Sequence, residues 1–205
     1  MSAVVLYGPP TAGKDTVTAA LRAADRRFRL VTKLKQGTGR STGYRFVTAD
    51  ELDALRQQGR IVVETRRYGN VYAVDRDSLE DPQAQGMVPV VHIGNVADLR
   101  TLLGRAPTAW LRVLLWVPRE VCAVRSRQRG DVDTPKRLTA WDETVQDLLR
   151  SDLQGLFDLV VRTDRVDTGT AAKEITTALD GPVRPLPPEE LRAALALAPP
   201  EPPGA

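Results

Sequence analysis

The sequence is poor in the residues that build metal sites and disulfides: its 205 residues include one cysteine, Cys122, and one histidine, His92. One cysteine cannot form an internal disulfide, and one Cys with one His cannot complete a zinc site. Zinc chemistry and thiol redox scaffolds are therefore excluded. The sequence also lacks an apolar run near the roughly 20 residues of a transmembrane span. The first residues carry no signal-peptide pattern, so we expect a cytoplasmic protein without membrane association.

Neither sign of charge dominates the sequence. The chain has 29 Lys and Arg against 26 Asp and Glu, a formal net charge of +3. That excess is too small to predict binding of nucleic acid or membranes by bulk charge. Any anion site must be local, and we expect a small-molecule partner. The length, with 42% hydrophobic residues, fits one domain with a genuine core.

Short apolar runs alternate with segments of helical periodicity. The runs are rich in Val and Leu, as in strands covered on both faces, and lie at residues 3–7, 87–93, 111–117 and 157–161. The helical segments lie at 14–24, 96–103, 119–128, 135–150 and 170–179. Thr134 reads as the capping residue before a proline at the first position of the fourth helix. The alternation predicts an α/β fold with a doubly wound parallel sheet.

Residues 28–74 break this rhythm, with strand-like pieces around 29–32, 61–65 and 71–74. Thr48 and Glu51 form a capping-box pattern that predicts a short helix. We expect a small mobile subdomain inserted at about 28–81.

Prolines gather at the C-terminal end of the chain. Eight of the 15 follow Asp180, so we expect a domain of residues 1–181 and a Pro-rich tail of residues 182–205. Within the tail, residues 188–198 predict one short helix, either docked loosely on the domain or awaiting a partner. Docking is the interpretation we favour.

The strongest motif lies directly between the first predicted strand and the first predicted helix. Its residues are Gly8, Pro9, Pro10, Thr11, Ala12, Gly13 and Lys14, followed by Asp15 and Thr16. The glycines let successive N–H groups converge on phosphate oxygens, and the helix adds the positive end of its dipole. The lysine contributes a compact positive charge toward the outer phosphates. The motif predicts a phosphate-binding loop for ATP.

One position departs from the usual pattern of such loops. The hydroxyl residue that normally follows the lysine and ligates Mg²⁺ is replaced by Asp15, and Thr16 comes next. An aspartate can bind the same hard cation directly or through water. We therefore expect Mg²⁺ with ATP and take Asp15 and Thr16 as the candidate metal ligands. An acidic residue in the first helical turn also has a purely structural use, because it complements the helix dipole.

Arginines cluster later in the chain. Arg125, Arg127 and Arg129 lie within five residues, followed by Gly130 and by Arg137. Guanidinium groups suit the negative charge that spreads over a transferred phosphoryl group. These residues predict a helical lid at about 125–150, with Arg125, Arg129 and Arg137 as candidate catalytic residues beside Lys14. The alternative is a solvated basic face neutralised by the neighbouring aspartates.

The order of these parts resembles the guanylate kinase family of nucleoside monophosphate kinases over roughly residues 3–180. The matching pieces are the phosphate-binding loop, Gly43-Tyr44-Arg45-Phe46, Glu64, Tyr68-Gly69-Asn70-Val71-Tyr72, and the arginine cluster. The resemblance implies a P-loop kinase core with an acceptor-binding insertion and a lid that closes over ATP. It also implies that two tyrosines and two arginines hold the acceptor phosphate, while a glutamate, an aspartate and small hydroxyls read guanine.

Carried over by position, Tyr44 and Tyr72 match the tyrosines, and Glu64 lies one residue off the family spacing. Lys35 or Arg40 stands in for the arginine pair. The hydroxyl expected two places after the second tyrosine is Val74, and the base-reading aspartate is replaced by His92. Lost hydrogen bonds of this kind relax or redirect specificity.

Several candidate acceptor residues also have ordinary structural readings. His92, at a predicted strand end, is an acceptor contact, a general base, or a hydrogen-bonded semi-buried histidine. Glu64 alternatively pairs with Arg66 or Arg67, and the two tyrosines alternatively pack within the insertion.

These residues predict an ATP-dependent phosphotransferase that acts on a small phosphorylated acceptor, most simply a nucleoside monophosphate. One alternative is a sugar-phosphate kinase, because Gly13-Lys14-Asp15 is similar to the ribosyl bisphosphate phosphokinases. Another is a catalytically silent, guanylate kinase-like module that binds a protein. The lysine of the loop and the lid arginines, which scaffold relatives typically lose, favour an enzyme.

Overall fold

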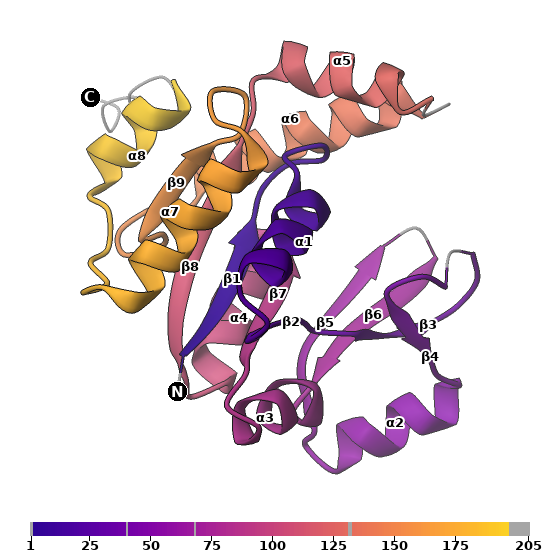
Figure 1. The fold of residues 1–205 in the computed structure, drawn as a ribbon. Helices are drawn as coiled ribbons and strands as arrows, with labels where there is room; N and C mark the ends of the chain where they lie inside the picture. Colours follow the sequence, from indigo (N-terminus) through magenta and orange to yellow (C-terminus); the bar gives the residue numbers. More distant parts are fainter. Residues whose placement is uncertain (1, 40, 68, 131–132, 197–205) are drawn as a thin grey trace, which may run out of the picture.

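Two sheets organise the molecule. The computed structural model describes residues 2–39, 41–67, 69–130 and 133–196. Its centre is a parallel sheet with the strand order β2-β7-β1-β8-β9 (Figure 1). These strands are β1 (Ser2–Tyr7), β2 (Phe28–Leu30), β7 (Val88–Ile93), β8 (Ala109–Trp116) and β9 (Leu159–Arg162). A second sheet, with the order β4-β3-β6-β5, contains β3 (Lys33–Gln36), β4 (Tyr44–Phe46), β5 (Ile61–Arg67) and β6 (Asn70–Asp75).

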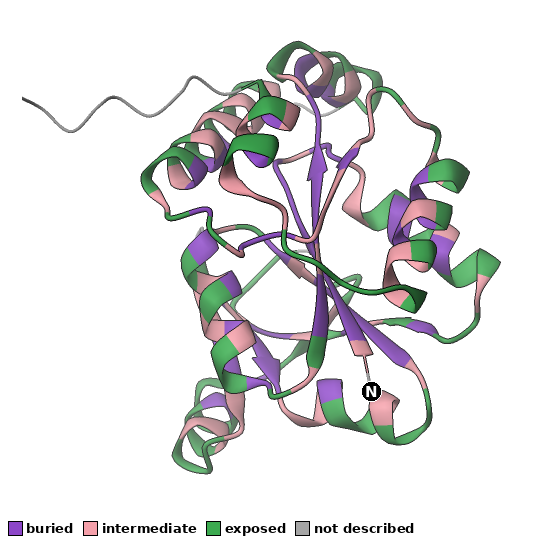
Figure 2. Cartoon of the chain, turned by 90° about the vertical axis from the view of Figure 1, so that its left-hand side faces the viewer, coloured by how far each residue is buried: buried purple, intermediate pink, exposed green. Residues whose placement is uncertain are grey.

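Helices cover both faces of the central sheet. One face packs against α1 (Lys14–Ala24) and α7 (Thr168–Asp180), and the other against α4 (Val96–Arg105), α6 (Thr134–Arg150) and α8 (Pro188–Leu195). The side chains of β1 alternate between these two cores: Val4 and Leu6 join the first, and Val5 and Tyr7 the second. The inner strands β1, β7 and β8 are mostly buried, while the outer sides of the helices are exposed (Figure 2). The predicted doubly wound α/β fold is confirmed.

The remaining helices lie at the edges of the central layer. Helix α5 (Arg119–Gln128) packs against α6, and α2 (Ala49–Gln57) covers the four-stranded sheet (Figure 1). Helix α3 (Asp77–Ala84) leads the chain from β6 back to β7. None of the helices in the described ranges is long and apolar enough to span a membrane.

Helix boundaries with local signals agree with the sequence. Helices α1 and α5 begin and end where they were predicted, and the capping box is present because Glu51 N donates to Thr48 Oγ1 while Thr48 N donates to Glu51 Oε2. Thr134 was predicted to cap α6, and this is wrong: the helix starts at Thr134 itself, with Asp133 before it making no side-chain cap bond. Strand β9 starts later than predicted because Phe157 is buried in the core before the strand begins.

The first strand of the expected insertion belongs to the central sheet. Phe28–Leu30 pairs in parallel with β7 and forms the edge of that sheet. The separate subdomain therefore begins after β2 and consists of β3, β4, α2, β5 and β6. Strands β3 and β4 and helix α3 were not predicted; α3 contains Pro82, which reads as a helix breaker.

The short helix of the tail docks on the core. Leu191 and Leu195 are buried in the same cluster as Tyr7 and Trp116. The backbone N–H of Leu186 also donates to the carbonyl of Phe157 at 2.8 Å. The packed core therefore extends past Gly181 to Leu195, and the last part of the tail, residues 197–205, lies outside the described residues.

Candidate active site

The phosphate-binding loop is held tightly against the central sheet. It runs from the end of β1 to the start of α1, where Gly13 has a φ of 89° and no side chain caps the helix. The first N–H groups of α1 therefore remain available to an anion. Gly8 has a φ of 153°, and a Cβ at this position would lie 2.2 Å from the carbonyl oxygen of Leu115. Only glycine lets the loop pass this close to β8.

The side chains of Thr11 and Lys14 in the loop both indicate a ligand-binding site. Thr11 adopts a φ of 60°, a strained conformation for a threonine, and its buried Oγ1 has no hydrogen-bond partner among the described residues. Lys14 folds back so that its Nζ donates to the carbonyl oxygens of Gly8 at 2.5 Å and Pro9 at 3.0 Å. Burial lowers the pKa of Lys14 to about 8. A phosphate oxygen would give Thr11 Oγ1 a hydrogen-bond partner and would give Lys14 an opposite charge in place of neutral carbonyls.

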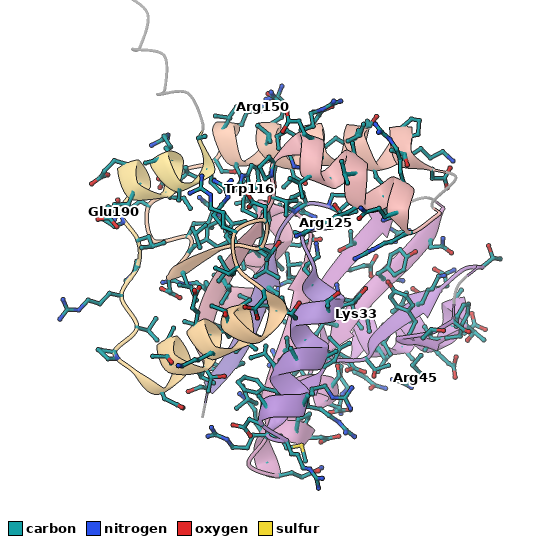
Figure 3. All side chains as sticks on the ribbon, turned by 45° about the horizontal axis from the view of Figure 1, so that its top comes forward. Lys33, Arg45, Trp116, Arg125, Arg150 and Glu190 are labelled. Atoms are coloured by element: carbon teal, nitrogen blue, oxygen red, sulfur yellow. The ribbon has the colours of Figure 1, made fainter. Side chains whose placement is uncertain are left out.

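Arg125 supports the loop from the side of α5. Its guanidinium donates to the carbonyl oxygen of Thr11 at 3.1 Å and to Thr163 Oγ1 at 3.1 Å. The hydroxyl of Thr163 in turn donates to the carbonyl oxygen of Ala12 at 3.0 Å. Burial lowers the pKa of Arg125. Figure 3 shows this residue beneath α5. Arg125 therefore positions the loop and is not a free side chain of a lid.

Two hollows border the loop, and a third adjoins one of them. The loop cleft, of about 690 Å³, is lined by residues of the loop together with Lys33, His92, Arg129 and Arg137. The outer hollow, of about 270 Å³, lies beyond Gly13 and is lined by Thr16, Arg125, Arg129 and Thr163 among others. Arg129 borders both, because it lies where α5 ends. Of the predicted lid arginines, Arg129 and Arg137 thus reach the cleft.

The third hollow, the sheet pocket, lies between the four-stranded sheet and the start of α4. Its volume is about 560 Å³, and its lining includes Tyr44, Thr65, Tyr72 and Asp98. The rings of Tyr44 and Tyr72 contact each other with centroids 5.3 Å apart. Asp98 accepts a hydrogen bond from Thr65 Oγ1 and another from the Asn95 amide at 2.7 Å. The pocket therefore combines an aromatic wall with an oriented carboxylate.

His92 lies on the phosphate side of the site. It lines the loop cleft, its Nε2 is 2.8 Å from Thr18 Oγ1, and its Nδ1 is 3.6 Å from Asp15 Oδ1. Burial and the charge of Lys14 lower the pKa of His92 to about 3. The ring is neutral near pH 7 and is a weak base, so the structure favours the hydrogen-bonded, semi-buried reading.

Glu64, one of the candidate acceptor residues, does not line these hollows. Glu64 lies on the face of the sheet that α2 covers, where its carboxylate accepts from Arg56 at 2.7 Å and pairs with Arg66 at 3.0 Å. The structural reading that we set beside the acceptor role therefore fits its position. Arg40 lies outside the described residues.

Lys35 is buried rather than exposed to the cleft. Its Nζ lies 5.5 Å from the ring centroid of Tyr44, 5.1 Å from Phe46 and 5.7 Å from Tyr72. Only 3% of the residue is exposed. A cation near three rings is attracted to their faces, so Lys35 packs against the aromatic wall of the sheet pocket.

The structure adds residues that the sequence did not single out. Lys33, Thr65, Arg67 and Asp98 line the loop cleft, the sheet pocket or both. The register of the hairpin is the signal that could have found Thr65. It pairs with Tyr72, whereas Glu64 pairs with Ala73, and paired residues share a face. No local pattern marks Lys33 or Arg67.

The donor set for a magnesium ion is small. Asp15, with 79% of its side chain exposed, and Thr16 both line the loop cleft. No group of three or more His, Cys, Asp or Glu that could hold a metal occurs within the described part of the chain. Mg²⁺ usually binds one or two protein oxygens together with substrate phosphates and water. These two residues fit that mode but not a cage made of protein alone.

The fold and the loop together define the class of the protein. A glycine-rich loop between a buried parallel strand and a helix, in a sheet covered on both faces, is the architecture of P-loop proteins. Within that class, the structure is similar to the crystal structure of guanylate kinase from Anaplasma phagocytophilum, with a TM-score of 0.61. The match covers 87% of this chain and 84% of that chain at 20% sequence identity. The guanylate kinase fold is thereby shown.

Relatives of the same kind appear in sequence comparison. The chain is 34% identical to the guanylate kinase of Cupriavidus metallidurans over 87 residues and 34% identical to that of Ralstonia nicotianae over 90 residues. These matches cover 40% and 42% of this chain, and 40% and 41% of the two relatives. The chain thus matches about two fifths of the length of these curated relatives, and no family model matches it. The comparisons confirm the resemblance to guanylate kinases.

We predict that Gly8→Ala destabilises the protein, because the new Cβ must push the loop away from Leu115 O. Overpacking of this kind costs roughly 1–3 kcal/mol in free energy of unfolding, and the positive φ adds to it. Gly104→Ala is the matched control: Gly104 lies in α4 with open space around it. Alanine should be neutral there or stabilise by up to about 1 kcal/mol. Urea unfolding of both variants makes the measurement, and equal stability of the two would contradict the account of the loop.

Proposed function

We propose that this protein is an ATP-dependent phosphotransferase that moves the γ-phosphoryl group of ATP to a small phosphorylated acceptor, a nucleoside monophosphate in the first instance. One observation carries the proposal. The loop cleft, which contains Lys14, adjoins the sheet pocket, because seven residues line both hollows. A donor and an acceptor bound in the two hollows would therefore meet at their phosphates.

The donor half follows from the loop. The N–H groups at the start of α1 and Lys14 hold the β- and γ-phosphates of ATP, and Thr11 Oγ1 gains the partner that it lacks. The outer hollow beside Arg125 takes the rest of the nucleotide. Arg129 and Arg137 neutralise the charge on the transferred group from the side of α5 and α6.

Magnesium belongs to the donor half as well. Asp15 and Thr16 are the residues that would hold Mg²⁺ beside the phosphates. When bound, the ion offsets the charge of the phosphate oxygens. Lys14, Arg129 and Arg137 do the same from the protein side.

The acceptor half follows from the sheet pocket. Tyr44 and Tyr72, with Lys35 packed against both rings, form the wall against which the acceptor lies. Their hydroxyls are the groups that bind the acceptor phosphate by analogy with the family. Asp98 offers a carboxylate to hydrogen-bond donors on the remainder of the acceptor.

The chemistry asks little of the protein beyond positioning. An acceptor phosphate oxygen attacks the γ-phosphorus, the bond to the β-phosphate oxygen breaks, and ADP leaves with the electron pair. The attacking oxygen is already anionic near neutral pH, so no proton has to be removed. This suits a site whose histidine is neutral and weakly basic. Aligning the two phosphates is itself a large part of the rate enhancement.

A second acceptor class, a sugar phosphate without a base, is favoured by one specific observation. Val74, which stands where guanine readers have a hydroxyl, is buried in the core, and Glu64 faces α2. Neither side chain therefore reads a base in the sheet pocket. A site lacking these hydrogen bonds discriminates less against acceptors that have no guanine.

The proposal predicts that ATP with Mg²⁺ is converted to ADP in the presence of at least one acceptor from a panel of GMP, AMP and ribose 1,5-bisphosphate. Loss of one charge that stabilises the transition state typically lowers turnover by about 10² to 10³-fold, which is the effect expected of Lys14→Ala. Lys173→Ala, on the exposed side of α7, is the matched control and should keep full turnover. A Lys14→Ala enzyme as fast as the wild type would refute the assignment.

A second prediction concerns pH. The pKa of Lys14 is about 8 without ligand, and bound phosphate raises it, so binding of ATP takes up a proton near pH 8. Affinity for ATP should therefore be greatest below pH 8 and fall as the pH rises toward 9.5. Titration calorimetry in two buffers of different ionisation enthalpy measures both quantities. In Lys14→Met the pH dependence should shrink, and a wild-type affinity that is constant from pH 7 to 9.5 would count against the role of Lys14.

A further inference from the structure

The junction between the loop cleft and the sheet pocket is where the two substrates of the proposed reaction would meet. The residues that line both hollows are mostly apolar or uncharged, and the two cationic ones are Lys33 and Arg67. Arg67 is already paired with Glu143 of α6 at 3.0 Å. The positive charge at the junction that has no such counter-charge is that of Lys33.

Lys33 is anchored at this junction by the backbone. It is the first residue of β3, directly opposite Tyr44, and its Nζ donates to the carbonyl oxygen of His92 at 2.5 Å. That carbonyl lies near the carboxyl end of β7, beside the phosphate-binding loop. The side chain therefore reaches from the four-stranded sheet to the central sheet. Figure 3 shows it between α1 and the strands of the smaller sheet.

The charge of Lys33 is poorly balanced by the protein. Among the described residues, no carboxylate lies within ion-pair distance of its Nζ, although Asp98 is near enough to interact electrostatically. Lys14 is a repulsive neighbour, because the charge of Lys33 disfavours the charged form of Lys14. Burial also lowers the pKa of Lys33 to about 8. Two buried ammonium groups at one cleft are stabilised when an anion lies between them.

We propose that Lys33 is a catalytic residue that contacts the γ-phosphoryl group of the donor on one side and the phosphate of the acceptor on the other. This inference rests on the proposed function and assigns to it a residue outside the motifs that indicated it. Two phosphates that must approach within bonding distance repel each other, and a cation at their junction offsets that repulsion. Lys14 contacts the phosphates that leave as ADP, while Lys33 contacts the phosphoryl group that is transferred.

The test compares two nucleotides that differ only in how far their phosphates extend. The phosphates of ADP occupy the loop alone, whereas those of adenosine 5′-pentaphosphate extend past the γ-position into the junction. Lys33→Met should weaken binding of the pentaphosphate at least tenfold and of ADP less than twofold. Lys14→Met should weaken both, and Lys173→Met, on the exposed surface of α7, should weaken neither. Retained ADP binding also shows that the Lys33 variant is folded.

The outcomes separate the inference from the function on which it rests. If the Lys33 variant binds the pentaphosphate as tightly as the wild type does, Lys33 does not contact the phosphates at the junction, and the inference fails while the proposed function stands. If the wild-type chain binds neither ADP nor the pentaphosphate, both fail. With the best acceptor of the panel, Lys33→Met should lower kcat more than it raises KM, and Lys33→Arg should recover part of the loss. A change in KM alone would overturn the catalytic role.

Discussion

The structure depends on one electrostatic constraint: two lysine ammonium groups, Lys14 and Lys33, are held in a buried cleft without carboxylate partners at ion-pair distance in the described parts of the chain. Backbone carbonyls satisfy their hydrogen bonds but do not neutralise their charge, and burial lowers the pKa of each to about 8. A protein keeps such an arrangement at a cost to its own stability. The resulting site has two positive charges that a bound polyphosphate would neutralise.

The surrounding architecture fixes these groups at the carboxyl ends of the parallel strands. Arg125 and Thr163 tie the loop to the segment that follows β9. On the other face, Asp147 of α6 accepts from the hydroxyl of Tyr7 at 2.9 Å and from the N–H of Val96 at 2.7 Å. One carboxylate thus joins the end of β1 to the starts of α4 and, through α6, to the arginines above the cleft. The ion pair of Arg67 with Glu143 links the smaller sheet to the same helix.

The sequence predicts the parts of this protein whose signals are local. The loop, the limits of α1 and α5 and the capping box of α2 depend on neighbouring residues, and the structure has them as predicted. The parallel sheet follows from buried strands alternating with helices. The start of α6, by contrast, was not predicted correctly, because Thr134 is the first residue of the helix and not its cap.

The acceptor side was less predictable, because it depends on pairing between distant strands. Glu64 and Thr65 differ by one residue, yet the register with Ala73 and Tyr72 places them on opposite faces of the sheet. Lys35 and Lys33 share a face, but the three rings around Lys35 remove it from the cleft and leave Lys33 exposed to it. Arg125 belongs to the arginine cluster that the sequence assigns to a lid. The structure shows that its guanidinium donates to the carbonyl oxygen of Thr11 instead.

The most direct measurement is a crystal structure of the chain grown with a nonhydrolysable ATP analogue and Mg²⁺. The account predicts that Lys14 Nζ leaves the carbonyl oxygens of Gly8 and Pro9 for phosphate oxygens, at hydrogen-bond distances of about 2.7–3.2 Å, and that the first N–H groups of α1 point at the same phosphates. A loop that keeps its present contacts, with the analogue bound elsewhere or not at all, would contradict the account.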